Sequence, residues 1–235
     1  MNKLIPSFKE TIFGANAGEV ATDLLEVGID SVLDEGLLRD VPIVGIIVGA
    51  AKVVQSVRDR NLLLQTLEFI RALREQSISE YELDRHRRKL DADPEYAEEE
   101  LGRVLVILDS TLDREKSRLL AGLYAALVEE RIDWDKFREL TDVVNRMFMA
   151  DFPTLRAVAA GEVQDTTRCG DAYRADRLSS LGPVALSPKS IFSNCMDNYV
   201  QLTALGGQLC ELTEQAQQSA ATRNGQSEAQ ENASA

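Results

Sequence analysis

The sequence predicts a mainly α protein with a helical bundle over residues 1–150, a smaller module with two short strands over 151–214, and a disordered tail over 215–235. Three observations lead to this fold class. Apolar residues recur at helical spacing through most of the first 150 positions. Glycine, proline and serine become frequent after Asp151, which is typical of turns and loops. Beyond residue 215 the chain has no apolar periodicity.

The N-terminal part of the bundle begins with an amphipathic segment over 19–38, which has one apolar and one acidic side. The sequence Asp40-Val41-Pro42 ends it, and proline favours the first turn of a following helix. That next helix contains the apolar stretch VPIVGIIVGAAKVV and runs over about 43–76. We expect it to be the central helix around which the bundle closes.

The stretch at 41–54 has three possible uses: a buried core helix, a contact with a second copy of the chain, or a conditional membrane insertion of 43–57 in a membrane-acting effector. Fourteen helical residues rise about 21 Å, whereas a hydrocarbon core is about 30 Å thick. The buried core is therefore the favoured interpretation. Glycines four apart allow a neighbouring backbone to approach closely. The candidate helix-contact residues are Gly45, Ile46, Gly49 and Lys52.

Capping patterns predict where the following helices begin. Ser79 with Glu82 has the spacing of a capping box. The pair Asp93-Pro94 combines a cap with a proline at the first helical position, and Asp133 is the expected cap of a helix starting at 134. These signals divide the chain after residue 76 into several amphipathic helices.

The C-terminal module contains the segments RLSSLGPVAL at 177–186 and NYVQLTALGGQLCEL at 198–212. Their order resembles the end of a winged-helix domain, in which a helix closes on a Leu-Gly turn and two strands precede a last helix. The resemblance implies a turn at Leu181-Gly182, strands over 184–186 and 199–202, and a cap at Thr203. The chain between 160 and 171 is short for the usual second helix, so the expected module is degenerate.

A winged helix implies an alternative function as a DNA-binding transcriptional regulator, with Arg174 and Arg177 as candidate DNA contacts. The charges argue against it, because residues 152–214 hold five Lys and Arg against seven Asp and Glu. DNA-binding proteins concentrate cations on the side that faces phosphate. We therefore expect the module to serve in packing or protein contact.

No catalytic motif is found. The single histidine, His86, lies among arginines and is expected at the surface, which leaves no second histidine for a metal site. The carboxylates at 98–100 are expected on an exposed helix face, and the cations Arg85, Arg87, Arg88 and Lys89 in salt bridges with nearby acids. The expectation is therefore no enzyme, no catalytic residue, no cofactor and no metal.

The charge and the cysteines restrict the partners. A formal charge of −13 repels phosphate backbones and anionic lipids, so nucleic acid and membranes are disfavoured. The three cysteines, Cys169, Cys195 and Cys210, form no paired motif, which suggests reduced thiols and a cytoplasmic location. We expect a non-enzymatic interaction or regulatory protein that binds another protein and that forms a homo-oligomer if the apolar helix is shared.

The segments DVPIVGIIVGAAKVVQSVRDR and LDREKSRLLAGLYAALVEERIDWDKFRELTDVVNRMFMADFPTLR, followed by the two Leu-Gly phrases, carry a wider likeness. Their order resembles an uncharacterised family of small helical bacterial and prophage proteins with a winged-helix-like C-terminal module. The resemblance implies a bacterial or phage origin and this order of elements, and it carries over no activity and no site residue.

Overall fold

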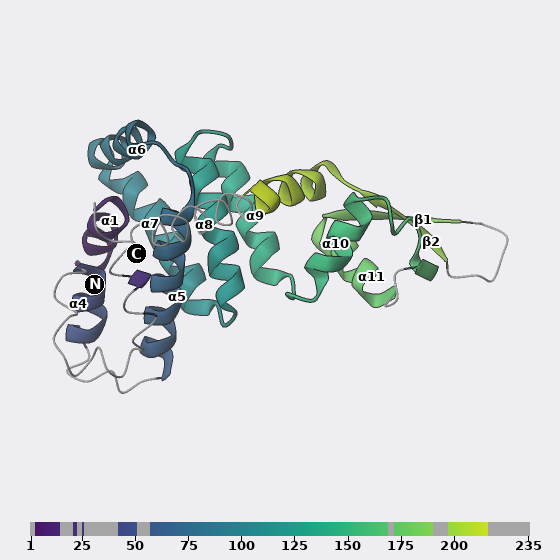
Figure 1. The fold of residues 1–235 in the computed structure, drawn as a ribbon, viewed down its shortest axis with the longest axis horizontal. Helices are drawn as coiled ribbons and strands as arrows, with labels where there is room; N and C mark the ends of the chain where they lie inside the picture. The colour runs from purple at the N-terminus through teal and green to yellow at the C-terminus, as the bar shows by residue number, and fades with distance from the viewer. Residues whose placement is uncertain are drawn as a thin grey trace, which may run out of the picture. The chain divides into compact units, whose positions relative to one another are not determined.

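A computed structural model describes residues 3–14, 21–22, 25, 42–50, 57–168, 172–189 and 197–215. The fold is mainly helical with a small two-stranded antiparallel sheet, as the sequence predicts (Figure 1). The described chain divides between Ile132 and Asp133 into two compact units, here called unit 1 and unit 2. The helix that starts at 134 therefore belongs to unit 2, whereas the sequence predicts the boundary between the bundle and the smaller module after residue 150. The expected helix over 19–38 and the tail lie mostly or wholly outside the described residues.

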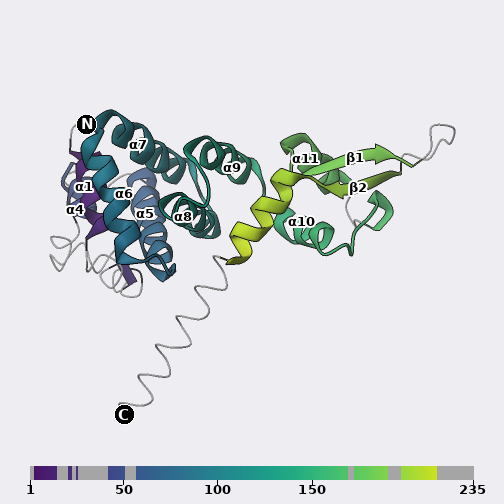
Figure 2. The ribbon, with the colours of Figure 1, turned by 90° about the horizontal axis from the view of Figure 1, so that it is seen from above.

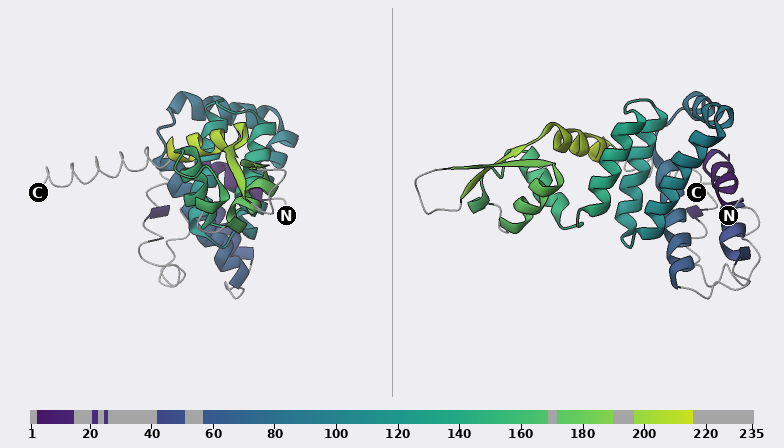
Figure 3. Two further views of the ribbon diagram at one scale, coloured as in Figure 1. Left: turned by 90° about the vertical axis from the view of Figure 1, so that its right-hand side faces the viewer. Right: turned by 180° about the vertical axis from the view of Figure 1, so that it is seen from behind.

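Unit 1 is a bundle of six described helices (Figure 1). They are α1 (Leu4–Phe13), α4 (Pro42–Ala50), α5 (Val57–Glu75), α6 (Glu80–Ala92), α7 (Pro94–Ser110) and α8 (Arg114–Val128). Helix α5 packs along α8 and also contacts α7, and the view from behind shows α5 and α8 side by side (Figure 3). Every residue from 119 to 128 is buried, so α8 is surrounded by other parts of the chain.

Helix α4 lies against α1 and α5. It begins at Pro42, as predicted, and the Thr11 hydroxyl of α1 accepts the Ile43 N–H at 3.1 Å. This bond satisfies one of the amide groups that a helix start leaves without a partner. The expected helix over 43–76 is described as two helices, α4 and α5, and residues 51–56 lie outside the described part.

The three predicted caps are confirmed. Ser79 and Glu82 form the full capping box of α6, with each side chain bonded to the other residue's backbone N–H. The Asp93 carboxylate accepts the Tyr96 N–H at 3.0 Å, and the Asp133 carboxylate accepts the Lys136 N–H at 2.8 Å. Asp93 is also the only residue between α6 and α7, so these two helices share one joint.

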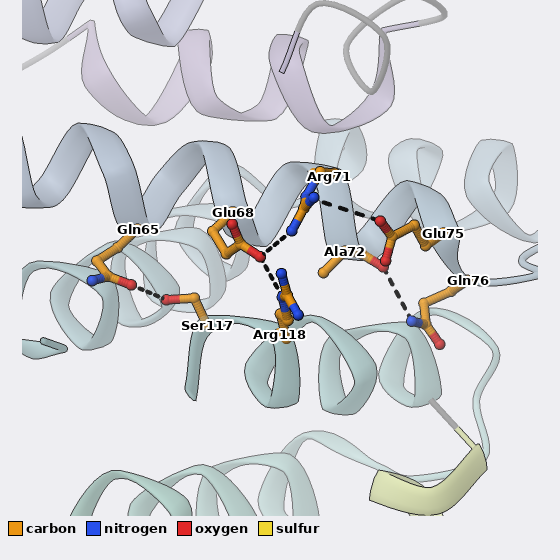
Figure 4. A network of polar contacts seen from close by, with 8 residues as sticks. All are labelled: Gln65, Glu68, Arg71, Ala72, Glu75, Gln76, Ser117 and Arg118. Carbon is orange, nitrogen blue, oxygen red and sulfur yellow. Dashed lines mark hydrogen bonds and ion pairs between the residues drawn. The ribbon is translucent and has the colours of Figure 1, made fainter. Parts of the chain in front are cut away.

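A ladder of polar side chains runs along the contact between α5 and α8 (Figure 4). Ser117 donates to the Gln65 side chain at 2.7 Å, and Arg118 pairs with the buried Glu68 carboxylate. Arg71, one turn along α5, donates to the same Glu68 oxygen at 2.5 Å. Buried polar groups cost free energy unless they are paired, so these bonds select one register of α5 on α8.

Unit 2 holds four described helices and a hairpin (Figure 2). The elements are α9 (Trp134–Arg146), α10 (Asp151–Ala159), the 3₁₀ turn η2 (Thr166–Arg168), α11 (Ala172–Leu181), β1 (Val184–Pro188), β2 (Asn198–Leu202) and a helix over 204–215. The two strands pair antiparallel, with Val184 opposite Leu202 and Leu186 opposite Val200. Both strands are longer than predicted.

The turn after α11 explains two glycines. Gly182 has φ +99, which favours glycine, and it ends α11 as predicted. Thr203 accepts the Gly206 N–H at 3.1 Å and therefore caps the helix over 204–215, as predicted. A Cβ on Gly206 would lie 2.0 Å from the Pro183 carbonyl oxygen, so only glycine allows this helix to approach the turn.

Candidate functional site

The residues predicted for a helix contact lie on α4 or just beyond it. Gly45 is exposed and Ile46 is half-buried, whereas Ile43, Val44 and Ile47 face the interior. Gly49 lies within α4, and Lys52 lies outside the described residues. An apolar side of α4 is thus buried within unit 1, while the contact of Gly45 with another helix stays a prediction.

In unit 2, an ion pair joins the start of α10 to α11. Asp151 is fully buried, and its Oδ2 accepts Arg177 Nε at 2.8 Å while Oδ1 pairs with Arg177 Nη2. The same Oδ2 accepts the Phe148 N–H at 3.0 Å. The bond and charge of Asp151 raise the pKa of Arg177 above its usual value. One carboxylate therefore fixes both the Arg177 guanidinium and the backbone at Phe148.

Two exposed aromatic rings flank this guanidinium. Phe148 is 60% exposed and Tyr173 is 54% exposed. The Arg177 Cζ lies 4.6 Å from the Phe148 ring centroid and 5.3 Å from that of Tyr173, and the Arg174 Cζ lies 5.9 Å from the Tyr173 centroid. We call Phe148, Tyr173, Arg174 and Arg177 the aromatic-arginine face. The two arginines were expected from the sequence as candidate contacts, whereas the two rings were not.

This face has the composition of a binding surface. Aromatic residues and arginine are enriched where proteins bind each other, and they supply much of the binding energy. Arg177 is bonded to Asp151 and lies against the Phe148 ring, so its side chain has little conformational entropy left to lose on binding. The arrangement is therefore suited to contact with another molecule.

A second polar cluster lies inside unit 1, and it corrects two expectations. His86, expected at the surface, is only 3% exposed, and Glu100, expected on an exposed helix face, is fully buried. Glu100 Oε1 lies 2.8 Å from His86 Nε2 and 2.8 Å from the Tyr124 hydroxyl. The His86 ring also lies near the rings of Phe13 and Tyr124, with centroids 6.1 and 5.9 Å away. These side chains join α1, α6, α7 and α8.

The protonation of this cluster follows from its hydrogen bonds. Burial by itself raises the pKa of Glu100, but bonds and charge from His86, Tyr96 and Tyr124 outweigh it and leave the pKa lowered. Burial and the Glu100 charge raise the pKa of Tyr124 well above its usual value, so this hydroxyl stays a donor. Glu100 and Tyr124 are both fully buried. A solute cannot reach them in this conformation, and the cluster serves packing.

A signal for Glu100 was present in the sequence. Ala97, Glu100, Leu101 and Val104 lie on one side of α7 at helical spacing, and all four are buried. Glu95, Glu98 and Glu99 surround this position, and so acidic a run resembles a solvent-exposed helix face. Asp151 and Arg177 are 26 residues apart and gave no local pattern.

The basic run at 85–89 and the cysteines are the remaining residues that the sequence singled out. Of the basic run, Arg85 lies 3.4 Å from the carboxylate of Glu130, an acid distant in sequence and not one of the nearby acids that were expected, and it also donates to the Val128 carbonyl. Lys89 lies over the Tyr96 ring. Cys210 is a free, buried thiol whose pKa is raised by burial, while Cys169 and Cys195 lie outside the described residues.

No family model matches the chain, and no curated protein or solved structure shows a significant similarity to it. Across the described ranges, no three His, Cys, Asp or Glu side chains come together as a metal site would require. In the same ranges, each helix is too short or too polar to span a bilayer.

Proposed function

We propose that this protein is a non-enzymatic interaction protein that acts through protein–protein contacts, and that the aromatic-arginine face of unit 2 binds its partner. The observation that carries the proposal is the pair of exposed rings, Phe148 and Tyr173, close to an arginine fixed by a buried carboxylate. Large exposed aromatics gain free energy when a partner covers them, and a fixed arginine adds directional hydrogen bonds.

We also propose that residues 151–214 form a winged-helix-like module. The order of α10, α11, the β1–β2 hairpin and the helix over 204–215 supports this. In such a module α11 would occupy the place of the recognition helix, and the aromatic-arginine face lies partly on it. Because Asp151 balances the Arg177 charge and Asp176 is exposed on the same helix, we favour a protein over DNA as the bound partner.

The partner is a different protein or a second copy of this chain, in a reducing cytoplasm that suits its free Cys210. The alternative function, DNA binding through Arg174 and Arg177, predicts a shift of duplex DNA at low salt that Arg174→Ala abolishes. Such a shift, together with no protein partner, would replace the present proposal.

Copurification after cross-linking in the source cells tests the proposal. The double variant Phe148→Ala/Tyr173→Ala removes both rings, and Tyr199→Ala removes an exposed ring on β2 of the same unit as a matched control. We expect the wild type and the control to retain the same partner, or the same dimer in light scattering, and the double variant to lose at least about tenfold in affinity. Equal retention by all three proteins would refute the assignment of this face.

A further inference from the structure

Helix α6 is joined to the rest of unit 1 by few buried side chains. Of its residues, His86 and Leu90 alone are buried, and their spacing of four places them on one side of the helix. Most of the other residues are charged and face solvent. By contrast, α8 is buried at every position from 119 to 128. The fully buried contact of α6 therefore consists of two side chains, and one of them is the single histidine of the chain.

His86 reaches across to α7 and meets Glu100, whose Oε1 also accepts the hydroxyl of Tyr124 from α8. One carboxylate oxygen thus holds α6 to the two helices beneath it. The remaining ion pairs of α6, Lys9 with Asp91 at 2.6 Å and Arg85 with Glu130 at 3.4 Å, are at least partly exposed. Exposed ion pairs contribute little to stability. Arg85 adds a half-buried bond to the Val128 carbonyl at 3.0 Å, so the bond between His86 and Glu100 is the most deeply buried polar contact of α6.

We propose that α6 is a releasable helix, which is docked at neutral pH through the hydrogen bond between His86 and Glu100 and is released on acidification while α5 and α8 stay packed. The proposal does not depend on the binding function of unit 2. Release uncovers the aromatic rings of Phe13 and Tyr124, against which the His86 ring now lies.

Acid acts on this bond in one direction. Burial raises the pKa of Glu100, whereas the bond and charge of His86, the one of its donors that leaves with α6, lower it. Docking of α6 is therefore favoured while Glu100 is ionised and weakens as the pH falls below the usual glutamate pKa. A protonated Glu100 no longer offers a charged acceptor to His86. The titratable groups facing the cluster or the α6 surface come from α1, α6, α7, α8 and the link after α8: Lys9, Glu82, Arg85, Lys89, Asp91, Tyr96, Glu99, Tyr124, Glu130 and Arg131.

The local structure of α6 allows it to move as a unit. Its capping box satisfies amide groups at its start with its own residues, so the helix keeps this cap when it leaves the bundle. A link over 76–79 precedes α6, and the single residue Asp93 follows it. These two joints are the places where the backbone can turn.

Hydrogen exchange measured by mass spectrometry at stepped pH from about 7 to about 3 tests the proposal. After correction for the intrinsic pH dependence, we expect amide protection over 80–92 to fall about tenfold at a pH where 119–128 is still fully protected. Simultaneous loss in both segments, or unchanged protection over 80–92, would overturn the proposal.

Two variants separate the His86 bond from general acid effects. Glu100→Gln keeps the size of the side chain and removes its titration, so α6 should be weakly protected at every pH. Tyr124→Phe removes the other hydrogen-bond donor and keeps the bond to His86, so it should keep the pH step of the wild type. If Glu100→Gln does not fold, the stepped-pH comparison of wild type with Tyr124→Phe decides. A missing step in both of these proteins refutes the release.

Discussion

Glu100 in unit 1 and Asp151 in unit 2 are both fully buried carboxylates, yet their partners differ. Glu100 is surrounded by His86, Tyr96 and Tyr124, and its nearest bonds come from groups inside the core. Asp151 binds Arg177, whose side chain is 27% exposed and ends near two solvent-facing rings. The same chemical group therefore organises a core in one unit and a surface in the other.

The partner of a buried carboxylate thus decides its role. Histidine and tyrosine donors that are themselves buried couple helices to each other, and losing their acceptor destabilises the whole unit. An arginine can stay hydrated on one edge while its other edge hydrogen-bonds the buried carboxylate, because its guanidinium has five donors in one plane. Variants at these two positions test this comparison.

The largest effect is expected for Glu100→Ala. It leaves His86 and Tyr124 buried without their acceptor, and we expect unit 1 to lose about 4 kcal/mol in free energy of unfolding. Urea denaturation followed by circular dichroism measures this loss. Glu98→Ala, an exposed position on the same helix, is the matched control and should stay near wild type. Equal small effects at both positions would contradict the role of Glu100.

A smaller loss is expected for Asp151→Ala. The variant removes the acceptor of Arg177 and of the Phe148 N–H, but Arg177 can turn its guanidinium to water. Trp134 is the single tryptophan of the chain, lies in unit 2 and stacks on Phe137 at 5.5 Å, so its fluorescence reports on this unit. A destabilisation equal to or above that of Glu100→Ala would show that exposure of the partner does not matter.

Tyr124→Phe should cost about 1 kcal/mol in the free energy of unfolding, the usual net value of one hydrogen bond. Glu100 keeps His86, and the ring of residue 124 still packs at 5.8 Å from Phe69. Urea denaturation beside Glu100→Ala gives the comparison. A loss as large as that of Glu100→Ala would mean that the hydroxyl, and not the carboxylate, organises the cluster.

The smallest effect is expected for Phe148→Ala. The side chain is 60% exposed and the Asp151 bond uses the backbone of residue 148, so the stability of unit 2 should stay within about 0.5 kcal/mol of wild type. Trp134 fluorescence in urea measures it. A marked destabilisation would assign Phe148 to the core of unit 2 and remove it from the proposed binding surface.

Local patterns predicted a good part of this fold. The caps at Ser79, Asp93 and Asp133 and the turn at Gly182 depend on residues a few positions apart, and all were found where the sequence indicated. The mainly helical class followed from apolar periodicity, whereas the two strands of unit 2 were expected from the resemblance to the end of a winged-helix domain.

The candidate site was only half predicted, for a physical reason. Arg174 and Arg177 were selected because of their charge, but the rings beside them come from another part of the chain or point outward like any surface tyrosine. Likewise, His86 and Glu100 lie in runs of charged residues that resemble a solvated face. Pairing between distant residues is decided by packing, which one sequence does not display.

The single residue between α6 and α7 sets the kinetics of any movement of α6. Since Asp93 keeps the end of α6 attached to the start of α7, the helix can swing about this joint but cannot diffuse away. Its return is therefore an intramolecular reaction with a high effective concentration, independent of the amount of protein. A helix held in this way reopens and closes many times without the chain having to fold again.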